Sequence, residues 1–125
     1  MYWITKNLAT SGLGEPEQKK VRNKTLVIVT DLVDGAGNNE EKFKSKVDQI
    51  EKAHKKGKKV IVVCGSGISR SNSVALAYLV KQGMDFDDAY NLVMEKVPVA
   101  NIDMGLLDLV KKIYLTKSNL DKPSG

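Results

Sequence analysis

The stretch Val60-Ile-Val-Val-Cys64-Gly-Ser-Gly-Ile-Ser-Arg70-Ser71 decides the fold, and a helical pattern follows it at once. Its first residues are apolar and β-branched, which is typical of a strand buried on both faces. After a Gly/Ser-rich turn, apolar residues recur at helical spacing, as Val74, Ala77 and Tyr78 do. A turn of this kind between a strand and a helix N-terminus directs several backbone N–H groups at one point, and the helix end adds partial positive charge. The stretch therefore predicts an anion site.

The residues at the two ends of the turn distinguish it from a nucleotide-binding loop. The Lys-Ser/Thr pair of such loops is missing, and a thiol, Cys64, and a guanidinium, Arg70, stand instead at the two ends. The N–H groups and the helix dipole that bind a phosphate also stabilise a thiolate. Arg70 can hold two oxygens of a phosphoryl group, and the Ser71 hydroxyl can hydrogen-bond the sulfur when it leaves. The pattern predicts phosphoryl transfer through a cysteine nucleophile.

Cys64-x5-Arg70-Ser71 with Gly67 inside it resembles the signature of cysteine-dependent protein phosphatases, and most of all the small dual-specificity class. The resemblance implies an α/β, protein-tyrosine-phosphatase-like fold with a short, mostly parallel central sheet flanked by helices and a C-terminal run of three helices. It implies a metal-independent enzyme without a cofactor, which hydrolyses phosphotyrosine, phosphoserine and phosphothreonine monoesters through a cysteinyl phosphate. The loop residues that would bind the substrate phosphate are Gly65, Ser66, Gly67, Ile68, Ser69 and Arg70. The opening Asn-Leu-Ala-Thr-Ser-Gly stretch at 7–12 is similar to small archaeal-type members.

The mechanism also needs a general acid on a separate loop, because phosphoryl transfer to the thiolate leaves an alkoxide or phenolate to be protonated. In the family this acid is an aspartate some thirty residues before the cysteine, and both Asp34 and Asp31 lie near that distance. We favour Asp34, because it heads a Gly-rich loop, whereas Asp31 stands at the end of a strand. An Asp-Gly pair also forms turns without any catalytic role.

One position departs from the family pattern, since Val63 stands where a histidine usually precedes the cysteine. Losing that group is expected to raise the pKa of Cys64 and to slow the enzyme. A catalytically weak or purely phosphate-binding relative is therefore the alternative. A rhodanese-like sulfurtransferase or arsenate reductase, which also uses a cysteine loop, would not need Asp34. The uncharged loop favours a protein phosphomonoester over an inositol lipid or an RNA end, and the mid-chain position of the motif excludes the low-molecular-weight class.

Length and composition bound the remaining possibilities. The chain has 125 residues, which suits one domain over 1–125 with a flexible tail at 118–125, and its net charge is +5. It has one cysteine and one histidine, so it can form no internal disulfide and no zinc site of the usual kinds. We expect a cytoplasmic monomer that acts on a phosphorylated protein or peptide and has no metal, nucleic-acid or membrane partner.

The rest of the chain predicts strands in the first half and helices in the second. Strands are expected at 2–4, 25–30 and 60–63, a strand and turn at 7–12, and a loop at 31–39. Helices are expected at 15–21, 40–56, 84–97 and 102–117, and one more helix follows Arg70 and ends at Gly83. His54, near the end of the apolar face of the helix at 40–56, is expected to pack rather than to catalyse. The turn at 97–101 resembles a family turn in which an asparagine, here Asn101, supports the active-site loop.

Overall fold

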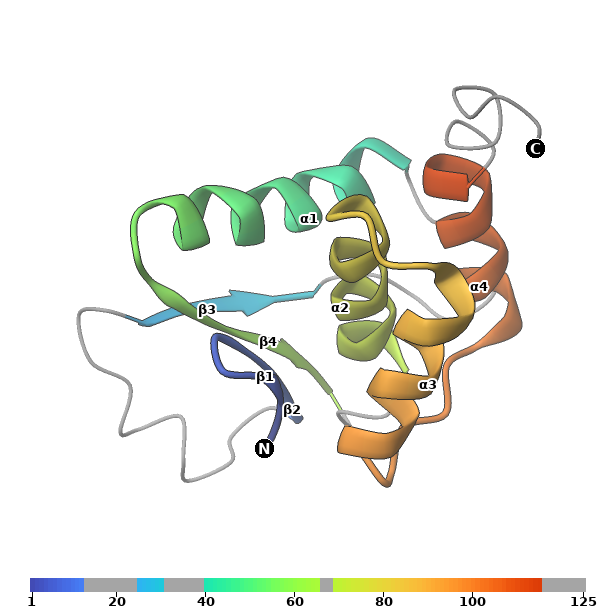
Figure 1. Cartoon of the computed structure of the whole chain (residues 1–125), viewed down its shortest axis with the longest axis horizontal. Helices are drawn as coiled ribbons and strands as arrows, with labels where there is room; N and C mark the ends of the chain where they lie inside the picture. Colours follow the sequence, from blue (N-terminus) through green and yellow to red (C-terminus); the bar gives the residue numbers. More distant parts are fainter. Residues whose placement is uncertain (13–24, 31–39, 66–68, 116–125) are drawn as a thin grey trace.

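The computed structural model describes residues 1–12, 25–30, 40–65 and 69–115. Within these residues, a four-stranded sheet has the order β1-β2-β4-β3 (Figure 1). Its strands are β1 (Tyr2–Thr5), β2 (Leu8–Gly12), β3 (Thr25–Val29) and β4 (Lys59–Cys64). β4 is parallel to both β2 and β3, whereas β1 is antiparallel to β2. The predicted mostly parallel sheet is confirmed, with the strand of the cysteine in its interior.

The helices lie mainly over one face of this sheet (Figure 1). They are α1 (Glu40–Lys55), α2 (Arg70–Lys81), α3 (Phe86–Lys96) and α4 (Met104–Val110), which continues as the π-helical turn η2 (Lys111–Leu115). α2 contacts β2 and β4 and is packed in turn by α1, α3 and α4. The predicted C-terminal run of helices, α2 to α4, is therefore confirmed. Its first helix, α2, is the one that the other helices pack around.

Alternation along β4 divides the core in two. Val60 and Val62 belong to the main core, together with the apolar faces of α1 and α2, while Ile61 and Val63 belong to a smaller cluster with Ala9. All four β4 valine and isoleucine side chains are at most 2% exposed. This burial on both faces is the physical reason for the uninterrupted apolar run in the sequence.

The residues at the helix ends explain where several helices start and stop. Gly57, at φ 76°, and Gly83, at φ 106°, adopt the left-handed conformation just after α1 and α2. Asp85 caps α3 by accepting a hydrogen bond from the Asp87 N–H. The predicted start at 84 is therefore two residues early, because a capping residue has a non-helical backbone.

The last helix also differs from its predicted range of 102–117. Asp103 caps it by accepting a hydrogen bond of 2.9 Å from the Gly105 N–H, so that α4 starts at Met104. Leu106, Val110 and Ile113 lie on the buried face of this helical segment. The switch to π-helical geometry at 111–115 has no signal in the sequence that we can identify.

Some predicted features lie outside the described residues, namely the helix at 15–21, the loop at 31–39 and the tail at 118–125. Among the helices that are described, none combines the length and apolar character needed to cross a bilayer.

Candidate active site

Cys64 is the last residue of β4 and is fully buried. It lies at the carboxyl end of the parallel strands, paired with Gly12 of β2. In open α/β sheets, ligands bind at this end of the strands. The Cys64 Sγ lies 3.4 Å from the Ser71 Oγ in the first turn of α2, so the thiol donates a hydrogen bond to that hydroxyl. When the sulfur is a thiolate, the same hydroxyl can donate to it instead.

Arg70 begins α2 and turns its guanidinium back toward the start of the loop. A Cβ atom built on Gly65 would stand only 2.9 Å from the Arg70 Nη2. Glycine at this position therefore leaves room for the arginine. Cys64, Gly65, Arg70 and Ser71, which the sequence predicts to act together, lie together in the structure.

Ser69 connects the loop to α2 and to a distant segment. It is 7% exposed and is the N-cap of α2, where its carbonyl accepts a hydrogen bond of 3.0 Å from the Ser73 N–H. Its hydroxyl does not cap the helix but accepts a hydrogen bond of 2.9 Å from the backbone N–H of Asp103. The Ser73 hydroxyl donates to the Arg70 carbonyl at 2.7 Å. These bonds fix the helix turn that carries Arg70.

The described contact between this turn and the loop comes from Asp103, while support of loop residues 66–68 by Asn101 lies outside the described residues and stays a prediction. Asn101 is exposed, and the hydrogen bond to Ser69 comes from the backbone of Asp103, two residues later. The carboxylate of Asp103 is engaged in capping α4, which orients its N–H toward Ser69. The Asp-x-Gly pattern at 103–105 is a sequence signal for this cap and for the start of α4, but not for the bond to Ser69.

Thr30 is a second residue that the sequence analysis missed. It follows β3 directly, and both its N–H, at 2.7 Å, and its hydroxyl, at 2.9 Å, donate to the carbonyl of Val63. That carbonyl belongs to the peptide group that leads into Cys64. A threonine at the end of a strand is common, so the sequence does not indicate this role.

The other predicted site residues fall outside the described part of the chain. These are the general-acid candidates Asp34 and Asp31 and the loop residues Ser66, Gly67 and Ile68. Among the residues that are described, no group of three or more His, Cys, Asp and Glu side chains is placed to hold a metal ion.

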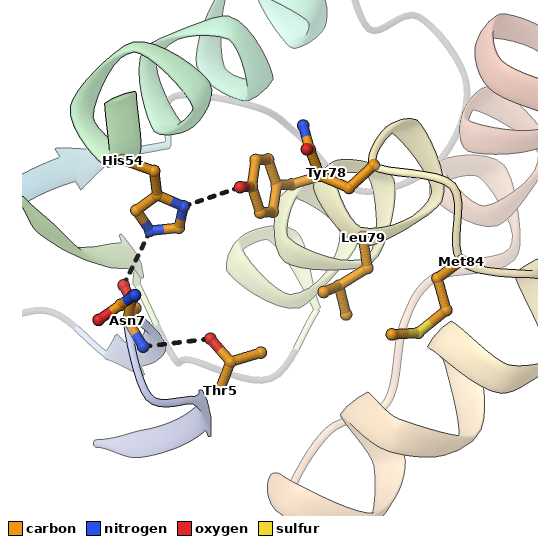
Figure 2. A pocket seen from close by; sticks show the side chains of 7 residues that line it. Thr5, Asn7, His54, Tyr78, Leu79 and Met84 are labelled. Carbon is orange, nitrogen blue, oxygen red and sulfur yellow. Dashed lines mark hydrogen bonds between the residues drawn. The ribbon is translucent and has the colours of Figure 1, made fainter. Parts of the chain in front are cut away.

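A cavity of about 500 Å³ is lined by residues of β1, the β1–β2 turn, α1 and α2, among them Asn7, His54 and Tyr78 (Figure 2). His54 crosses its wall: its Nε2 donates a hydrogen bond of 3.0 Å to the Asn7 carbonyl, and its Nδ1 lies 2.8 Å from the Tyr78 hydroxyl. Because a carbonyl can only accept, Nε2 carries a proton, and in that tautomer of the imidazole Nδ1 is the acceptor for the Tyr78 hydroxyl. Burial, and then the Glu51 carboxylate, raise the pKa of Tyr78 above its usual value. His54 thus joins α1, α2 and the β1–β2 turn, in agreement with its expected packing role.

Residues 6–114 match the family model for the dual specificity phosphatase catalytic domain. The chain belongs to this family. The domain is 44% identical over 72 residues to human dual specificity protein phosphatase 16, an alignment that covers 54% of this chain and 11% of that protein. It is 39% identical over 59 residues to the tyrosine-protein phosphatase MSG5 of Saccharomyces cerevisiae, covering 46% of this chain and 12% of that protein. The aligned part thus spans only a small fraction of these relatives.

Solved structures show the same fold for the dual specificity phosphatase domain. Human DUSP28 superposes with a TM-score of 0.79 at 18% identity, over 97% of this chain and 100% of that one. The human tyrosine phosphatase-like serine/threonine/tyrosine-interacting protein gives a TM-score of 0.75 at 20% identity, over 94% and 97% of the two chains. The predicted family and the predicted phosphatase-like fold are therefore both confirmed.

Proposed function

We propose that this domain is a protein phosphatase that hydrolyses phosphotyrosine, phosphoserine and phosphothreonine monoesters through a phosphorylated Cys64. The observation that carries the proposal is the position of the thiol: its Sγ is buried at the end of β4, 3.4 Å from the Ser71 hydroxyl. Arg70 turns toward the same loop over Gly65. The match to the family over residues 6–114 supports this reading over the rhodanese-like alternative.

In the first step, the Cys64 thiolate attacks the phosphorus and the bond to the ester oxygen breaks. Arg70 binds two oxygens of the phosphoryl group and neutralises the charge that develops on them. Asp34 is our choice for the acid that gives its proton to the departing oxygen. The products are a free alcohol or phenol and a cysteinyl phosphate.

In the second step, water attacks the cysteinyl phosphate and the sulfur–phosphorus bond breaks. The same carboxylate takes a proton from the water, so that inorganic phosphate forms and the acid is restored. The electron pair of the broken bond returns to sulfur as a thiolate. The Ser71 hydroxyl, which is already within hydrogen-bond distance of Sγ, stabilises that thiolate as it forms.

For the substrate, we propose phosphorylated proteins or peptides bound by a cytoplasmic monomer. The loop segment 65–69 has no charged side chain, so it offers no cation for the additional phosphates of an inositol lipid. A single cysteine in the whole chain suits a reducing compartment, where the nucleophile stays a thiol.

Val63 favours one alternative, a phosphate-binding module without turnover. The position before the nucleophile is apolar and fully buried, so its side chain adds no hydrogen bond to the loop. A thiolate with weaker support is protonated more readily, and the thiol attacks slowly. Binding of a phosphopeptide by the loop and Arg70 would survive this loss.

The deciding experiment measures para-nitrophenyl phosphate hydrolysis from about pH 4.5 to about pH 8.5, in EDTA and a reductant. We expect the wild-type domain to be active, Cys64→Ser to be inactive, and Asp34→Asn to lose activity mainly at low pH, where the acid is needed. Phosphotyrosine and phosphothreonine peptides of one sequence then compare the substrate classes. A wild-type domain that binds these peptides but hydrolyses none of the substrates at any pH would overturn the proposal and identify a binding module.

A further inference from the structure

The last carbonyl of the ladder between β3 and β4, that of Val63, accepts two hydrogen bonds from one residue. The parallel ladder runs as far as the pair Val29 and Val63, and Thr30 follows it. The Thr30 N–H donates to the Val63 carbonyl at 2.7 Å, and the Thr30 hydroxyl donates to the same oxygen at 2.9 Å. A parallel ladder normally gives each carbonyl a single backbone donor. This carbonyl therefore receives a second donor at the point where the sheet ends.

These two hydrogen bonds hold the peptide group that connects Val63 to the nucleophile. A peptide group is planar, so fixing the Val63 carbonyl also fixes the N–H and the Cα of Cys64. Strand ends open more readily than strand centres, and glycine-rich turns add further freedom. Two bonds to one oxygen hold this plane at the edge of the turn, and so hold the Cys64 Sγ where it meets Ser71.

Val63 itself offers no such support from its side chain. It is fully buried in the small cluster with Ala9 and Ile61, on the face of the sheet away from the main core. The hydroxyl of Thr30, 5% exposed, reaches the backbone of this residue from the neighbouring strand. The Thr30 hydroxyl therefore supports the backbone at a position where the side chain before the cysteine has no polar group.

We propose that Thr30 is a positioning residue for Cys64: its hydroxyl holds the peptide plane of the nucleophile at the end of β4. The proposal deepens the function proposed above and rests on it only for the effect on turnover. The position of the thiol can be measured without turnover.

The first test variant is Thr30→Val, which keeps the size of the side chain and the backbone bond but removes the hydroxyl. Thr30→Ala removes the same oxygen without adding a methyl group in its place and is the second variant. Thr30→Ser restores the hydroxyl. The matched control is Thr10→Val on β2, because Thr10 is 1% exposed and its Oγ1 has no hydrogen-bond partner in the structure.

The readout is the rate of Cys64 alkylation by iodoacetamide as a function of pH, since the chain has no other cysteine. A Cys64 thiolate that is held less closely to Ser71 and to the start of α2 loses part of its stabilisation. We therefore expect the alkylation midpoint of Thr30→Val and Thr30→Ala to rise by about 0.7 pH unit, which is about a fivefold change in the ionisation constant. Their kcat/KM for para-nitrophenyl phosphate is expected to fall about fivefold. Thr30→Ser and Thr10→Val should keep the wild-type values.

Two results would overturn the inference. One is an unchanged alkylation midpoint in both Thr30→Val and Thr30→Ala. The other is a Thr30→Ser variant that shifts as much as they do, because the hydroxyl would then not be the active group. Absent turnover in the wild type, together with a shifted midpoint in the variants, would reject the phosphatase function and leave the role of Thr30 intact.

Discussion

The backbone N–H of Asp103 donates a hydrogen bond of 2.9 Å to the Ser69 hydroxyl. This bond joins the turn before α4 to the residue at which the loop of the cysteine becomes α2. The side chain of Asp103 caps α4 at the same time. The C-terminal helix of the domain thus takes part in holding the site, although none of its side chains enters the proposed chemistry.

Ser69→Ala is expected to weaken both the fold and the site. The Asp103 N–H would lose its acceptor in a partly buried position, at a cost of about 1–3 kcal/mol in unfolding free energy. We expect Tm to fall by several degrees, about 4 °C for each kcal/mol, and kcat/KM for para-nitrophenyl phosphate to fall about tenfold. Ser45→Ala, at an exposed position of α1, is the control for serine loss. Equal values for Ser69→Ala and Ser45→Ala would show that the bond to Asp103 contributes nothing.

Gly65→Ala should affect phosphate binding rather than stability. The new Cβ would lie 2.9 Å from the Arg70 Nη2, and the guanidinium at the end of a flexible side chain has to move away. We expect inorganic phosphate to inhibit the variant about tenfold less strongly, while Tm changes by no more than about 2 °C. Competitive inhibition and thermal unfolding measure the two effects. A variant with unchanged phosphate inhibition would mean that Arg70 binds phosphate from another position.

Ser71→Ala is expected to slow the second chemical step more than the first. Without the hydroxyl, the sulfur leaves the cysteinyl phosphate with less stabilisation, and the intermediate accumulates. Rapid-quench measurements should show a burst of para-nitrophenol followed by a steady rate about a hundredfold below the wild type. Ser73→Ala is the matched variant, because its hydroxyl bonds the Arg70 carbonyl in the same helix turn. We expect no burst of para-nitrophenol from Ser73→Ala. A burst in both variants would mean that the slow second step results from a disturbed helix turn and not from loss of the Ser71 hydroxyl.

Tyr78→Phe tests the hydrogen bond between His54 and Tyr78 beside the cavity. The variant loses the hydrogen bond to His54, which should lower the unfolding free energy by about 1 kcal/mol at pH 7 and leave kcat/KM within about twofold of the wild type. Burial and Glu51 raise the pKa of Tyr78 above its usual value of 10. The wild-type advantage is therefore complete below pH 10 and is lost as the pH rises through the folded-state pKa.

Urea unfolding of both proteins at neutral pH and at about pH 11 measures this difference. Lysines that titrate in the same range affect the two proteins equally and cancel in the comparison. A stability gap of the same size at both pH values would contradict the assignment to the Tyr78 hydroxyl.

Sequence patterns predicted the parts of the fold that depend on local order. The apolar run at 60–63 can be buried only as an interior strand, and the helix that starts at Arg70 follows from the spacing of Val74, Ala77 and Tyr78. The motif then brings Cys64 and Arg70 to the two ends of one turn. In each case the residues that decide the structure are neighbours in sequence.

The missed parts depend on contacts between segments that are distant in the sequence. Nothing near Thr30 indicates that its hydroxyl will meet Val63, and nothing near Ser69 indicates the backbone of Asp103 as its donor. Both are bonds to main-chain atoms, which every residue possesses, so the identity of the partner leaves no mark in the sequence. The choice between Asp34 and Asp31 lies outside the described residues and stays a prediction.

The central position of β4 also constrains the order in which the protein can fold. β2 and β3 do not pair with each other, and β4, which comes later in the chain, joins β3 to the antiparallel pair of β1 and β2. During synthesis from the ribosome, β1 and β2 can pair early, but β3 must wait for residues 59–64 before it acquires its partner. Parallel pairings over such sequence distances fold slowly, because the connecting chain has to be ordered first. The strand that delivers the nucleophile is thus also the strand on which assembly of the parallel part of the sheet depends.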